Sequence, residues 1–372
     1  MFRNKSINNL KPYKVTSHKA WEHKEDKDVL KLDWNEATIL PSPLVEKRLQ
    51  DVITNGRLNW YPDTNNTDLL NKISKYNNVD VSNVQYFASS DVLHEYIVRC
   101  FIGESDRVLI IGPTYDNFRA VAESNGAQIQ NYYLDSNFEL DYRKFNEDLK
   151  LIRPKVVYIV NPNNPTGTLH PKEELINLIQ QNTDTFFIVD EAYYEFSGIT
   201  LSQDVEKYKN VLISRTFSKA FALASFRIGY TISHENNIEI LNSIRNPKNV
   251  SLFAQEAALA ALSDIEYTKS YVDDVLDTKT NFSRALQKFE WIDTVYEGTG
   301  NFVFFSFKEA IKKKELLSYF NKNKIFIRDY GHIDLTSKFV RITVGKSIEM
   351  SKVLKVLNTF NNEFVGSEYK QD

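Results

Sequence analysis

Short apolar runs that are rich in β-branched and aromatic residues recur through the middle of the chain. They are VQYFAS at 84–89, RVLIIG at 107–112, KVVYIV at 155–160, TFFIVDE at 185–191, NVLISRTF at 210–217 and RIGYTI at 227–232. Stretches with helical periodicity, such as 117–127 and 172–182, separate most of them. This alternation predicts an α/β fold with a mostly parallel central sheet and helices on both of its faces. Such a sheet binds ligands beyond the carboxyl ends of its strands.

The pattern changes near residue 270, where a long polar helix is followed by three strand-like runs: GNFVFFSF at 300–307, IFIRDY at 325–330 and FVRITVG at 339–345. With a final helical segment, they predict a smaller α+β domain over residues 271–372. Residues 51–270 are expected to form a large domain, which would bind the cofactor. Residues 1–50 are polar and irregular, and we expect an arm that forms part of the small domain or contacts a partner subunit.

Composition and charge limit the classes of partner and compartment that the protein can have. The 372 residues are 42% hydrophobic and 26% charged with a net charge of -3, which gives no electrostatic reason to expect nucleic acid or a membrane as partner. The one cysteine, Cys100, excludes an intrachain disulfide and indicates a reducing compartment. The N-terminus lacks the apolar core of a signal peptide, and the run at 252–262 is far shorter than the ~20 residues that span a bilayer. We therefore expect a cytoplasmic protein that acts on small molecules.

Several familiar motifs are absent. The sequence contains no GxGxxG, GxxxxGK, HExxH, GxSxG or CxxC, and its six histidines are scattered. This argues against a nucleotide-binding loop, a zinc protease site and a serine hydrolase of the usual type, and no metal site is expected. The chemistry must come from polar residues at the strand ends.

Polar side chains follow three of the predicted strands. NPNNPTG at 161–167 follows the first, Asp190 ends the second with Tyr193 three residues later, and Lys219 lies just past the third. Each feature alone also fits a structural role: a fixed turn, a capping or ion-paired carboxylate, or a solvated lysine. Because the carboxyl ends of such strands face one crevice, an acid, a phenol and an amine would meet there.

One chemistry fits this combination well, which is pyridoxal phosphate held by a lysine as a Schiff base. Lys219 would form that bond, which removes the penalty of burying an ammonium group, and Asp190 would keep the pyridine nitrogen protonated. Two residues would hydrogen-bond the ring oxygen: Asn164 and Tyr193. Three residues near the lysine would hold the phosphate: Thr216, Ser218 and Arg227.

The segments NPNNPTG, DEAYYEF and RTFSKAFALASFRIGY resemble the class I and II aminotransferases of the aspartate aminotransferase fold. SKAFALA followed by NVSLFAQEAALAAL is most similar to the histidinol-phosphate aminotransferase branch. The resemblance extends from LKPYK near residue 10 through LDWNEATILPSP, LNWYPD and GPTYDNF to IFIRDY and RITVG, which is nearly the whole chain. It implies the pyridoxal phosphate transferase fold of type I and a homodimer with sites near the subunit interface.

The resemblance also implies roles for residues outside these strand ends. Tyr115 matches the aromatic residue that stacks on the cofactor ring, and Tyr61 matches a tyrosine that reaches the cofactor phosphate of the other subunit. Arg341 matches the arginine that binds the substrate α-carboxylate, and Arg328 matches the position that contacts a distal phosphate. Two asparagines match substrate-binding positions: Asn35 and Asn164. The family's phosphate-binding loop at a helix N-terminus corresponds to Ser89, Ser90 and Asp91.

The sequence departs from the family's pattern at positions that border the substrate side. Ser89 replaces a glycine, and Val92 follows Asp91 where a glutamate is usual. Lys248 stands where a tyrosine is common, and Ala37 follows Asn35 and Glu36 where a second asparagine is usual. The segment that contains His18 and Trp21 lacks the usual glycine. These differences bear most on the identity of the substrate.

We therefore expect a homodimeric aminotransferase that moves an amino group between an amino acid, with glutamate as the expected donor, and a keto acceptor resembling imidazole acetol phosphate. Lys219 would act as the general base and acid of the proton transfer. A decarboxylase of a phosphorylated amino acid such as threonine phosphate is the alternative with the same cofactor. A ligand-binding protein without catalysis is a third possibility, which the presence of Lys219, Asp190 and Arg341 disfavours.

Overall fold

The computed structural model describes residues 2, 4–8, 10–13, 19–331 and 334–364, so that His18 lies outside the described residues. The chain divides into two compact units. Unit 1 comprises Met1–Tyr13, Pro41–Asn164 and Thr168–Thr268, and unit 2 comprises Lys14–Leu40, Pro165–Gly167 and Lys269–Asp372. The sequence predicted domain limits at residues 50 and 270, and these limits remain a prediction.

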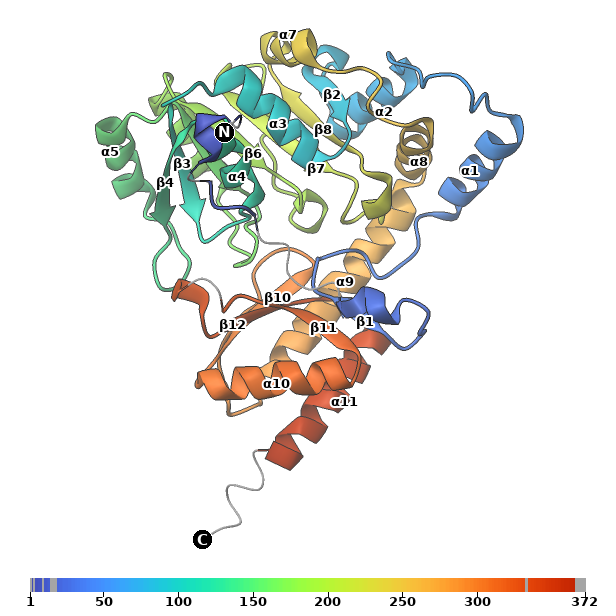
Figure 1. Ribbon diagram of the computed structural model, residues 1–372, viewed down its shortest axis with the longest axis vertical. Helices are drawn as coiled ribbons and strands as arrows, with labels where there is room; N and C mark the ends of the chain where they lie inside the picture. Colours follow the sequence, from blue (N-terminus) through green and yellow to red (C-terminus); the bar gives the residue numbers. More distant parts are fainter. Residues whose placement is uncertain (1, 3, 9, 14–18, 332–333, 365–372) are drawn as a thin grey trace. The chain divides into compact units, whose positions relative to one another are not determined.

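A seven-stranded sheet forms the centre of unit 1 (Figure 1). In spatial order its strands are β2 (Val84–Phe87), β8 (Gly229–Ser233), β7 (Val211–Thr216), β6 (Phe186–Asp190), β5 (Val156–Val160), β3 (Arg107–Gly112) and β4 (Gln128–Tyr133). Neighbouring strands are parallel except at β8, which is antiparallel to both β2 and β7. The predicted mostly parallel sheet is confirmed, and each of the six predicted strands forms.

The central strands form because their side chains are apolar on both faces. Every residue of β5 and β7 is buried. Their valines and isoleucines fit the pleated surface, and apolar burial stabilises the sheet by about 25 cal/mol per Å². The edge strand β4 was not predicted, because its sequence QIQNYY is polar and no residue of it is fully buried. It forms because it pairs along its whole length with β3.

Helices α1 to α8 belong to unit 1. They are α1 (Pro43–Asn55), α2 (Thr67–Asn77), α3 (Ser90–Phe101), α4 (Asn117–Ser124), α5 (Tyr142–Ile152), α6 (Lys172–Gln181), α7 (Glu235–Ile244) and α8 (Leu252–Leu262). The predicted helices at 117–127 and 172–182 correspond to α4 and α6. Helix α3 packs against β2, β7 and β8. Helix α3 begins just after the carboxyl end of β2. Because β2 runs in the same direction as β7, the N-terminus of α3 lies at the edge of the sheet where β5, β6 and β7 end.

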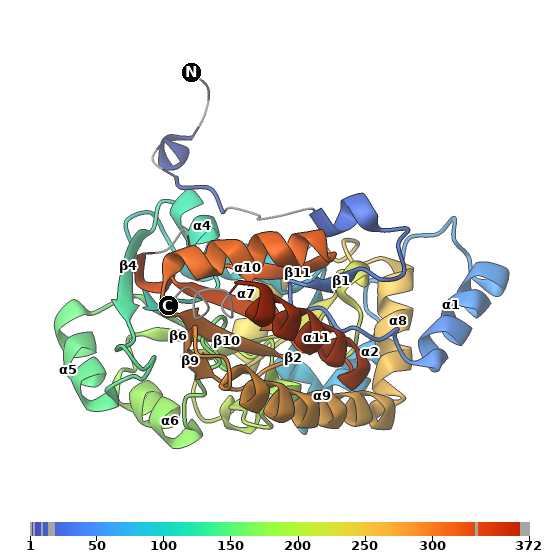
Figure 2. The same ribbon diagram turned by 90° about the horizontal axis from the view of Figure 1, so that it is seen from below.

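Unit 2 is a smaller α+β unit around a five-stranded sheet. In spatial order the strands are β1 (Leu30–Leu32), β11 (Ile325–Asp329), β12 (Phe339–Thr343), β10 (Phe302–Phe307) and β9 (Ile292–Tyr296). β1 is parallel to β11, and the other pairs are antiparallel. The helices are α9 (Ile265–Leu286), which begins in unit 1, α10 (Ala310–Lys322) and α11 (Ser347–Phe364). Helix α10 contacts α11, β10 and β11, as Figure 2 shows.

The prediction that residues 1–50 are irregular is wrong in part. Leu30–Leu32 form β1, and Pro43 begins α1 with Ser42 as its N-cap. Three alternating residues are too few to produce a recognisable strand pattern, and β1 is stabilised by pairing with β11, almost 300 residues later in the chain. Among the described residues, no helix is long and apolar enough to cross a membrane.

Candidate active site

The three strand ends that carry the predicted chemistry lie side by side. Val160 at the end of β5 pairs with Asp190 at the end of β6, and Asp190 pairs with Ser214 in β7. Lys219 follows β7 within three residues. Strand pairing therefore brings Asn164, Asp190 and Lys219 to one edge of the sheet of unit 1, as the sequence predicted.

Asp190 is a buried carboxylate surrounded by donors. It is 3% exposed, and it accepts hydrogen bonds from the Tyr158 hydroxyl at 2.8 Å and the Ala192 N–H at 3.1 Å. The Nε2 atom of His94 lies 3.6 Å from its Oδ2 atom. Burial raises the pKa of Asp190, and the proximity of His94 and the Tyr158 hydroxyl lowers it in part. A carboxylate in such a place favours a cationic partner, and the protonated pyridine nitrogen of the predicted cofactor would be one.

His94 and Tyr158 were not identified from the sequence. His94 is fully buried on α3, neither of its ring nitrogens has a hydrogen bond within the described part of the chain, and its ring packs edge-on against Tyr158 and Phe118. A histidine on an otherwise apolar helix face is a weak signal, since a buried histidine often serves packing alone. Only the fold places it beside Asp190.

Lys219, Tyr193 and Asn164 form a second group at the same edge. The Asn164 amide donates to the Tyr193 hydroxyl at 3.2 Å. The Lys219 ammonium lies 5.8 Å from the centre of the Tyr193 ring. Lys219 is half-buried, whereas Tyr193 is 3% exposed. The amine and the two groups predicted to bind the ring oxygen are therefore close together.

Asp91 connects the residues predicted to stack on the ring and to bind its phosphate. Its Oδ1 atom accepts hydrogen bonds from the Tyr115 hydroxyl at 3.0 Å and the Asn117 amide at 3.2 Å. Its Oδ2 atom lies 3.1 Å from Nη2 of Arg227, whose side chain is half-exposed. Burial and the charge of Asp91 raise the pKa of Tyr115, which keeps that phenol neutral. Arg227 would have to share its charge between Asp91 and a phosphate.

The loop before α3 fits the phosphate of the predicted cofactor. Ser89 is the N-cap of α3, and helix N-terminal N–H groups favour an anion. A side chain at Gly229 would place its Cβ 2.8 Å from the Ser90 nitrogen, so that only glycine leaves the loop in place. The Thr216 hydroxyl accepts a hydrogen bond from the Ser218 N–H at 3.1 Å, which orders the turn before Lys219. The residues present therefore suit the group that the sequence implied.

The substitution of Ser89 for the family's glycine retains a glycine-like backbone. Ser89 has φ 95° and ψ 162°, a region that residues with a Cβ rarely adopt and that costs about 1 to 3 kcal/mol. We expect Ser89→Gly to stabilise the apoenzyme by about 1 kcal/mol, because the strain is relieved while glycine at an N-cap loses only a few tenths. Ser89→Ala is the control: it keeps the strain, loses the cap and should be less stable than the native protein. Denaturant unfolding measures both, and a less stable Ser89→Gly would contradict the strain.

Unit 2 carries the two arginines predicted to bind substrate. Arg328 in β11 and Arg341 in β12 are directly opposite each other in an antiparallel pair, so their side chains leave the same face of the sheet. Arg341 is 4% exposed, and it donates to the Tyr330 hydroxyl at 3.1 Å and to the Asp33 carbonyl. Arg328 is half-buried. Like charges directly opposite repel, and an anion between them relieves the repulsion.

Two other predicted residues have different surroundings. Asn35 in unit 2 is fully buried with φ 56°, and its side-chain oxygen accepts a hydrogen bond from Thr343 at 3.1 Å. These contacts hold the backbone, and a role of Asn35 toward substrate stays a prediction. Tyr61 in unit 1 is 78% exposed, and the Lys248 ammonium lies 4.6 Å from the centre of its ring. Tyr61 therefore faces solvent in the isolated chain, beside the lysine that replaces a tyrosine.

Comparisons with known proteins show the family of the chain. A sequence model of the family described as aminotransferase class I and II matches residues 27–357. The chain is 42% identical over 370 residues to a dihydroxyacetone phosphate transaminase of Campylobacter jejuni, with 97% of each chain covered. It is 33% identical over 333 residues to a histidinol-phosphate aminotransferase of Ruminiclostridium cellulolyticum, with 88% of this chain and 91% of that one covered. A solved histidinol-phosphate aminotransferase of Sinorhizobium meliloti in complex with pyridoxal 5'-phosphate has a TM-score of 0.86 at 24% identity, with 96% of this chain and 98% of that one covered.

Proposed function

The chain belongs to the class I and II aminotransferases, and we propose that its keto substrate is a small phosphorylated ketone of the dihydroxyacetone phosphate class, with glutamate as amino donor. The cross-strand pair of Arg328 and Arg341 carries this proposal. A phosphate dianion matches two adjacent guanidinium groups better than a single carboxylate does. The similarity to the dihydroxyacetone phosphate transaminase supports the same substrate class.

The named relatives share one feature of substrate chemistry. In dihydroxyacetone phosphate, and in the keto form of histidinol phosphate, the reacting carbonyl carbon carries a CH2–O–phosphate group and no carboxylate. An arginine reserved for the α-carboxylate would then have no anion in the acceptor half of the reaction. We therefore assign Arg341 to the anion of both partners, the glutamate α-carboxylate and the acceptor phosphate, and Arg328 to the second charge of the phosphate.

The cofactor of this family is pyridoxal phosphate, which supplies an aldehyde that takes up the amino group and a ring that accepts electrons. Asp190 holds the proton on the ring nitrogen, and Tyr158 and His94 orient that carboxylate. Lys219 holds the cofactor and then moves the proton at the reacting carbon. The remaining roles are contacts to the ring and its phosphate, from Tyr115, Asn164, Tyr193, Thr216, Ser218, Arg227 and the 89–91 loop.

Half-reactions followed in the visible spectrum test the substrate assignment. The holoenzyme mixed with glutamate should change the absorbance of its cofactor, and dihydroxyacetone phosphate should reverse the change and yield the corresponding amine. Reversal by imidazole acetol phosphate alone would identify the histidinol-phosphate substrate instead. Release of carbon dioxide from threonine phosphate would identify the decarboxylase, and a spectrum that no amine changes would leave only ligand binding.

We expect the two arginines to differ in their effects. Arg341→Ala should lower kcat/KM for glutamate and for the phosphorylated ketone alike, by ~2 to 4 kcal/mol if a buried charge pair is lost. Arg328→Ala should lower kcat/KM for the phosphorylated ketone by about tenfold or more, and that for alanine, which has no distal carboxylate, by less than about threefold. Arg328→Lys, which keeps the charge, is the control. Equal losses with the ketone and with alanine would remove the main support for a phosphorylated acceptor.

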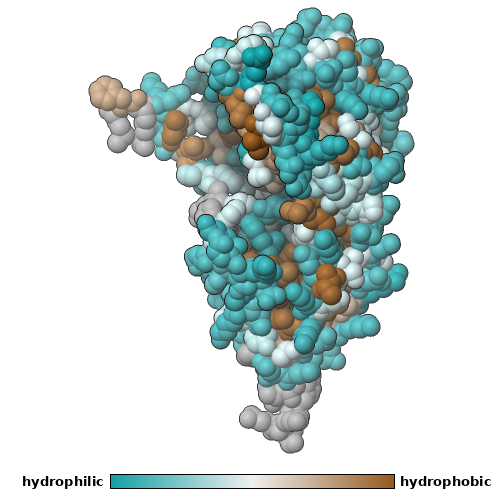
Figure 3. Space-filling model, turned by 90° about the vertical axis from the view of Figure 1, so that its right-hand side faces the viewer, coloured by the Kyte–Doolittle hydropathy of each residue, from teal (hydrophilic) through white to brown (hydrophobic). Residues whose placement is uncertain are grey.

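A homodimer is part of this proposal. Several large apolar side chains of unit 1 are more than half exposed near Tyr61: Ile53, Leu58 and Trp60. Figure 3 looks onto the side that carries α1 and α8 in Figure 1, and hydrophobic side chains are distributed over it among polar ones. A second copy that covers them would bring Tyr61 into its partner's site. Sedimentation should therefore find a dimer, and we place the enzyme in the cytoplasm, consistent with its single cysteine.

A further inference from the structure

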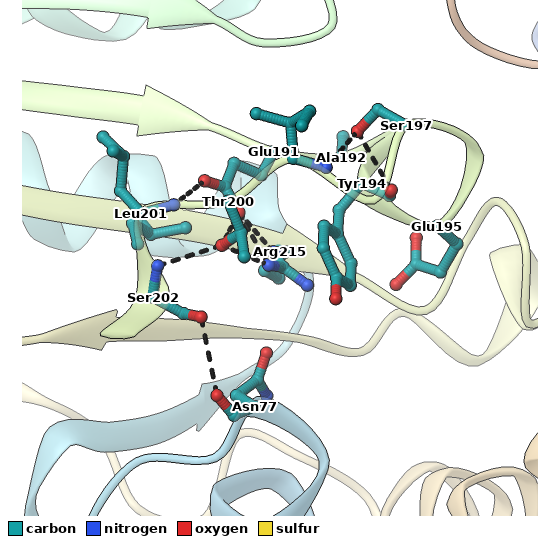
Figure 4. Close-up of polar contacts among 12 residues, drawn as sticks. Asn77, Glu191, Ala192, Tyr194, Glu195, Ser197, Thr200, Leu201, Ser202 and Arg215 are labelled. Atoms are coloured by element: carbon teal, nitrogen blue, oxygen red, sulfur yellow. Dashed lines mark hydrogen bonds and ion pairs between the residues drawn. The ribbon is translucent and has the colours of Figure 1, made fainter. Parts of the chain in front are cut away.

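A buried ion pair lies directly next to the cofactor-binding strand ends (Figure 4). It joins Glu191, which follows β6, to Arg215 in β7. Both residues are 1% exposed. Neither residue has a role in the catalytic steps above, so their burial needs a separate explanation.

The pair is held by a set of short contacts. The Nε and Nη2 atoms of Arg215 lie 2.8 and 2.7 Å from Oε2 of Glu191. The Thr200 hydroxyl accepts a hydrogen bond from Nη2 of Arg215 at 2.8 Å and donates one to Oε2 of Glu191 at 2.8 Å. The Leu201 N–H donates to Oε1 of Glu191 at 3.0 Å. The guanidinium carbon also lies 3.5 Å from the centre of the Tyr194 ring. We call Glu191, Thr200 and Arg215 the Glu-Thr-Arg cluster.

The Glu-Thr-Arg cluster joins three pieces of backbone. Two are the adjacent strand ends of β6 and β7, which are also linked by a hydrogen bond from the Glu191 N–H to the Ser214 carbonyl at 2.9 Å. The third is the segment from Tyr194 to Ser202, which follows β6 and returns to its end, where Thr200 and Leu201 bond Glu191 (Figure 4). Separating the two strand ends would leave each buried charge without its partner, and moving the third segment would remove the Thr200 and Leu201 hydrogen bonds to Glu191.

Each charged residue is the immediate neighbour of a residue assigned to the cofactor. Glu191 follows Asp190, and Arg215 precedes Thr216. Successive side chains of an extended chain point to opposite faces, so the ion pair lies on one side of the strand ends while Asp190 and Thr216 point to the other. A movement of the ion pair would therefore move both cofactor-binding residues.

Stability alone does not account for this arrangement. Removing an ion pair from water costs about as much as the attraction returns, and apolar pairs of similar size are often equally stable. Arg215 also faces a second carboxylate, Glu195, whose pKa burial raises to about 7. The hydrogen bonds between the Glu191 carboxylate and the Arg215 guanidinium are directional. The cluster therefore fixes the orientation of the two side chains as well as the distance between them.

We propose that Glu191 and Arg215 are positioning residues that set the separation and orientation of the β6 and β7 ends, so that Asp190 and the Thr216 to Lys219 segment fit one cofactor. The inference rests on the cofactor roles assigned above. A displacement of about 1 Å at reacting groups lowers rates by about a hundredfold, so a rigid clamp between the two strand ends has a direct chemical use.

The double variant Glu191→Gln with Arg215→Met separates positioning from stability. It removes both charges of the ion pair together, glutamine still offers an oxygen to the Leu201 N–H, and Glu195, whose pKa burial already raises to about 7, can take up a proton when Arg215 is lost. We expect its apoenzyme to unfold near the native temperature, whereas Arg215→Met alone, which leaves Glu191 buried and unpaired, should unfold at a clearly lower one. The double variant should nevertheless bind pyridoxal phosphate about tenfold more weakly and react with glutamate about tenfold to a hundredfold more slowly. The absorbance of its bound cofactor should titrate at a shifted pH.

Two further variants keep the test decisive. Thr200→Val removes the bridging hydroxyl at constant shape, and should weaken cofactor binding by a few-fold in a protein that folds normally. Lys172→Met breaks the more exposed pair with Asp204, 2.8 Å apart in the same unit, and should change none of these readouts. Native cofactor affinity, titration and rate in the double variant, or in Thr200→Val should the double variant not fold, would overturn the proposal. Because cofactor binding is measured without any keto acceptor, an error in the proposed substrate leaves this result unaffected.

Discussion

Lys219→Ala is expected to abolish turnover and to leave a folded protein that still binds pyridoxal phosphate noncovalently. The ring and phosphate contacts of the site remain, but the covalent attachment and the base that moves the proton are lost. General base catalysis alone contributes about 10²- to 10⁴-fold, so the rate should fall by at least that factor. Stopped-flow measurement of the glutamate half-reaction tests the rate, and dialysis against buffer tests whether the cofactor dissociates.

An exposed lysine provides the control for this substitution. Lys207→Ala, in the same unit, should leave the rate and the spectrum unchanged. A small added amine should restore part of the lost rate of Lys219→Ala, since it can replace the missing base. A Lys219→Ala enzyme that without such an amine works within about tenfold of the native rate would show that Lys219 is not the catalytic base.

Asp190→Asn is expected to be nearly as damaging. The amide cannot balance the positive charge of a protonated pyridine nitrogen, and a charge pair in this buried place is worth several kcal/mol, so the rate should fall by about a thousandfold or more. Asparagine keeps an oxygen for the Ala192 N–H, and its NH2 group can donate to the Tyr158 hydroxyl, so the side chain should keep its position and the loss should come from the charge. The absorbance of the bound cofactor and the glutamate half-reaction both report it.

Two variants bracket the Asp190 result. Asp184→Asn, at an exposed position just before β6, should be without effect. Tyr158→Phe keeps the carboxylate and removes one of its hydrogen bonds, so its loss should lie well below that of Asp190→Asn. A nearly native rate in Asp190→Asn would mean that the carboxylate serves the fold alone.

Most of the fold could be predicted from local patterns. The strands of the central sheet are continuous apolar runs because both of their faces are buried, and such runs are visible without any knowledge of their neighbours. β1, β4 and β9 escaped prediction, because β1 is three residues long and the other two have few buried residues, and all three depend on pairing with a partner strand. Their stability comes from backbone hydrogen bonds, which leave little trace in side-chain composition.

The sequence by itself determined the residues that follow strands. Lys219 and Asp190 were identified because a polar group at the end of an apolar strand must be solvated, paired or used in chemistry. The motifs around them also resemble one family. The contacts among residues distant in the chain were decided only by the tertiary structure. His94 meets Asp190 across 96 positions and Glu191 meets Arg215 across 24, because helix α3 packs on the sheet and β6 pairs with β7. A local sequence pattern cannot predict these contacts, because the free energy that stabilises them comes from the packing and burial of the whole unit.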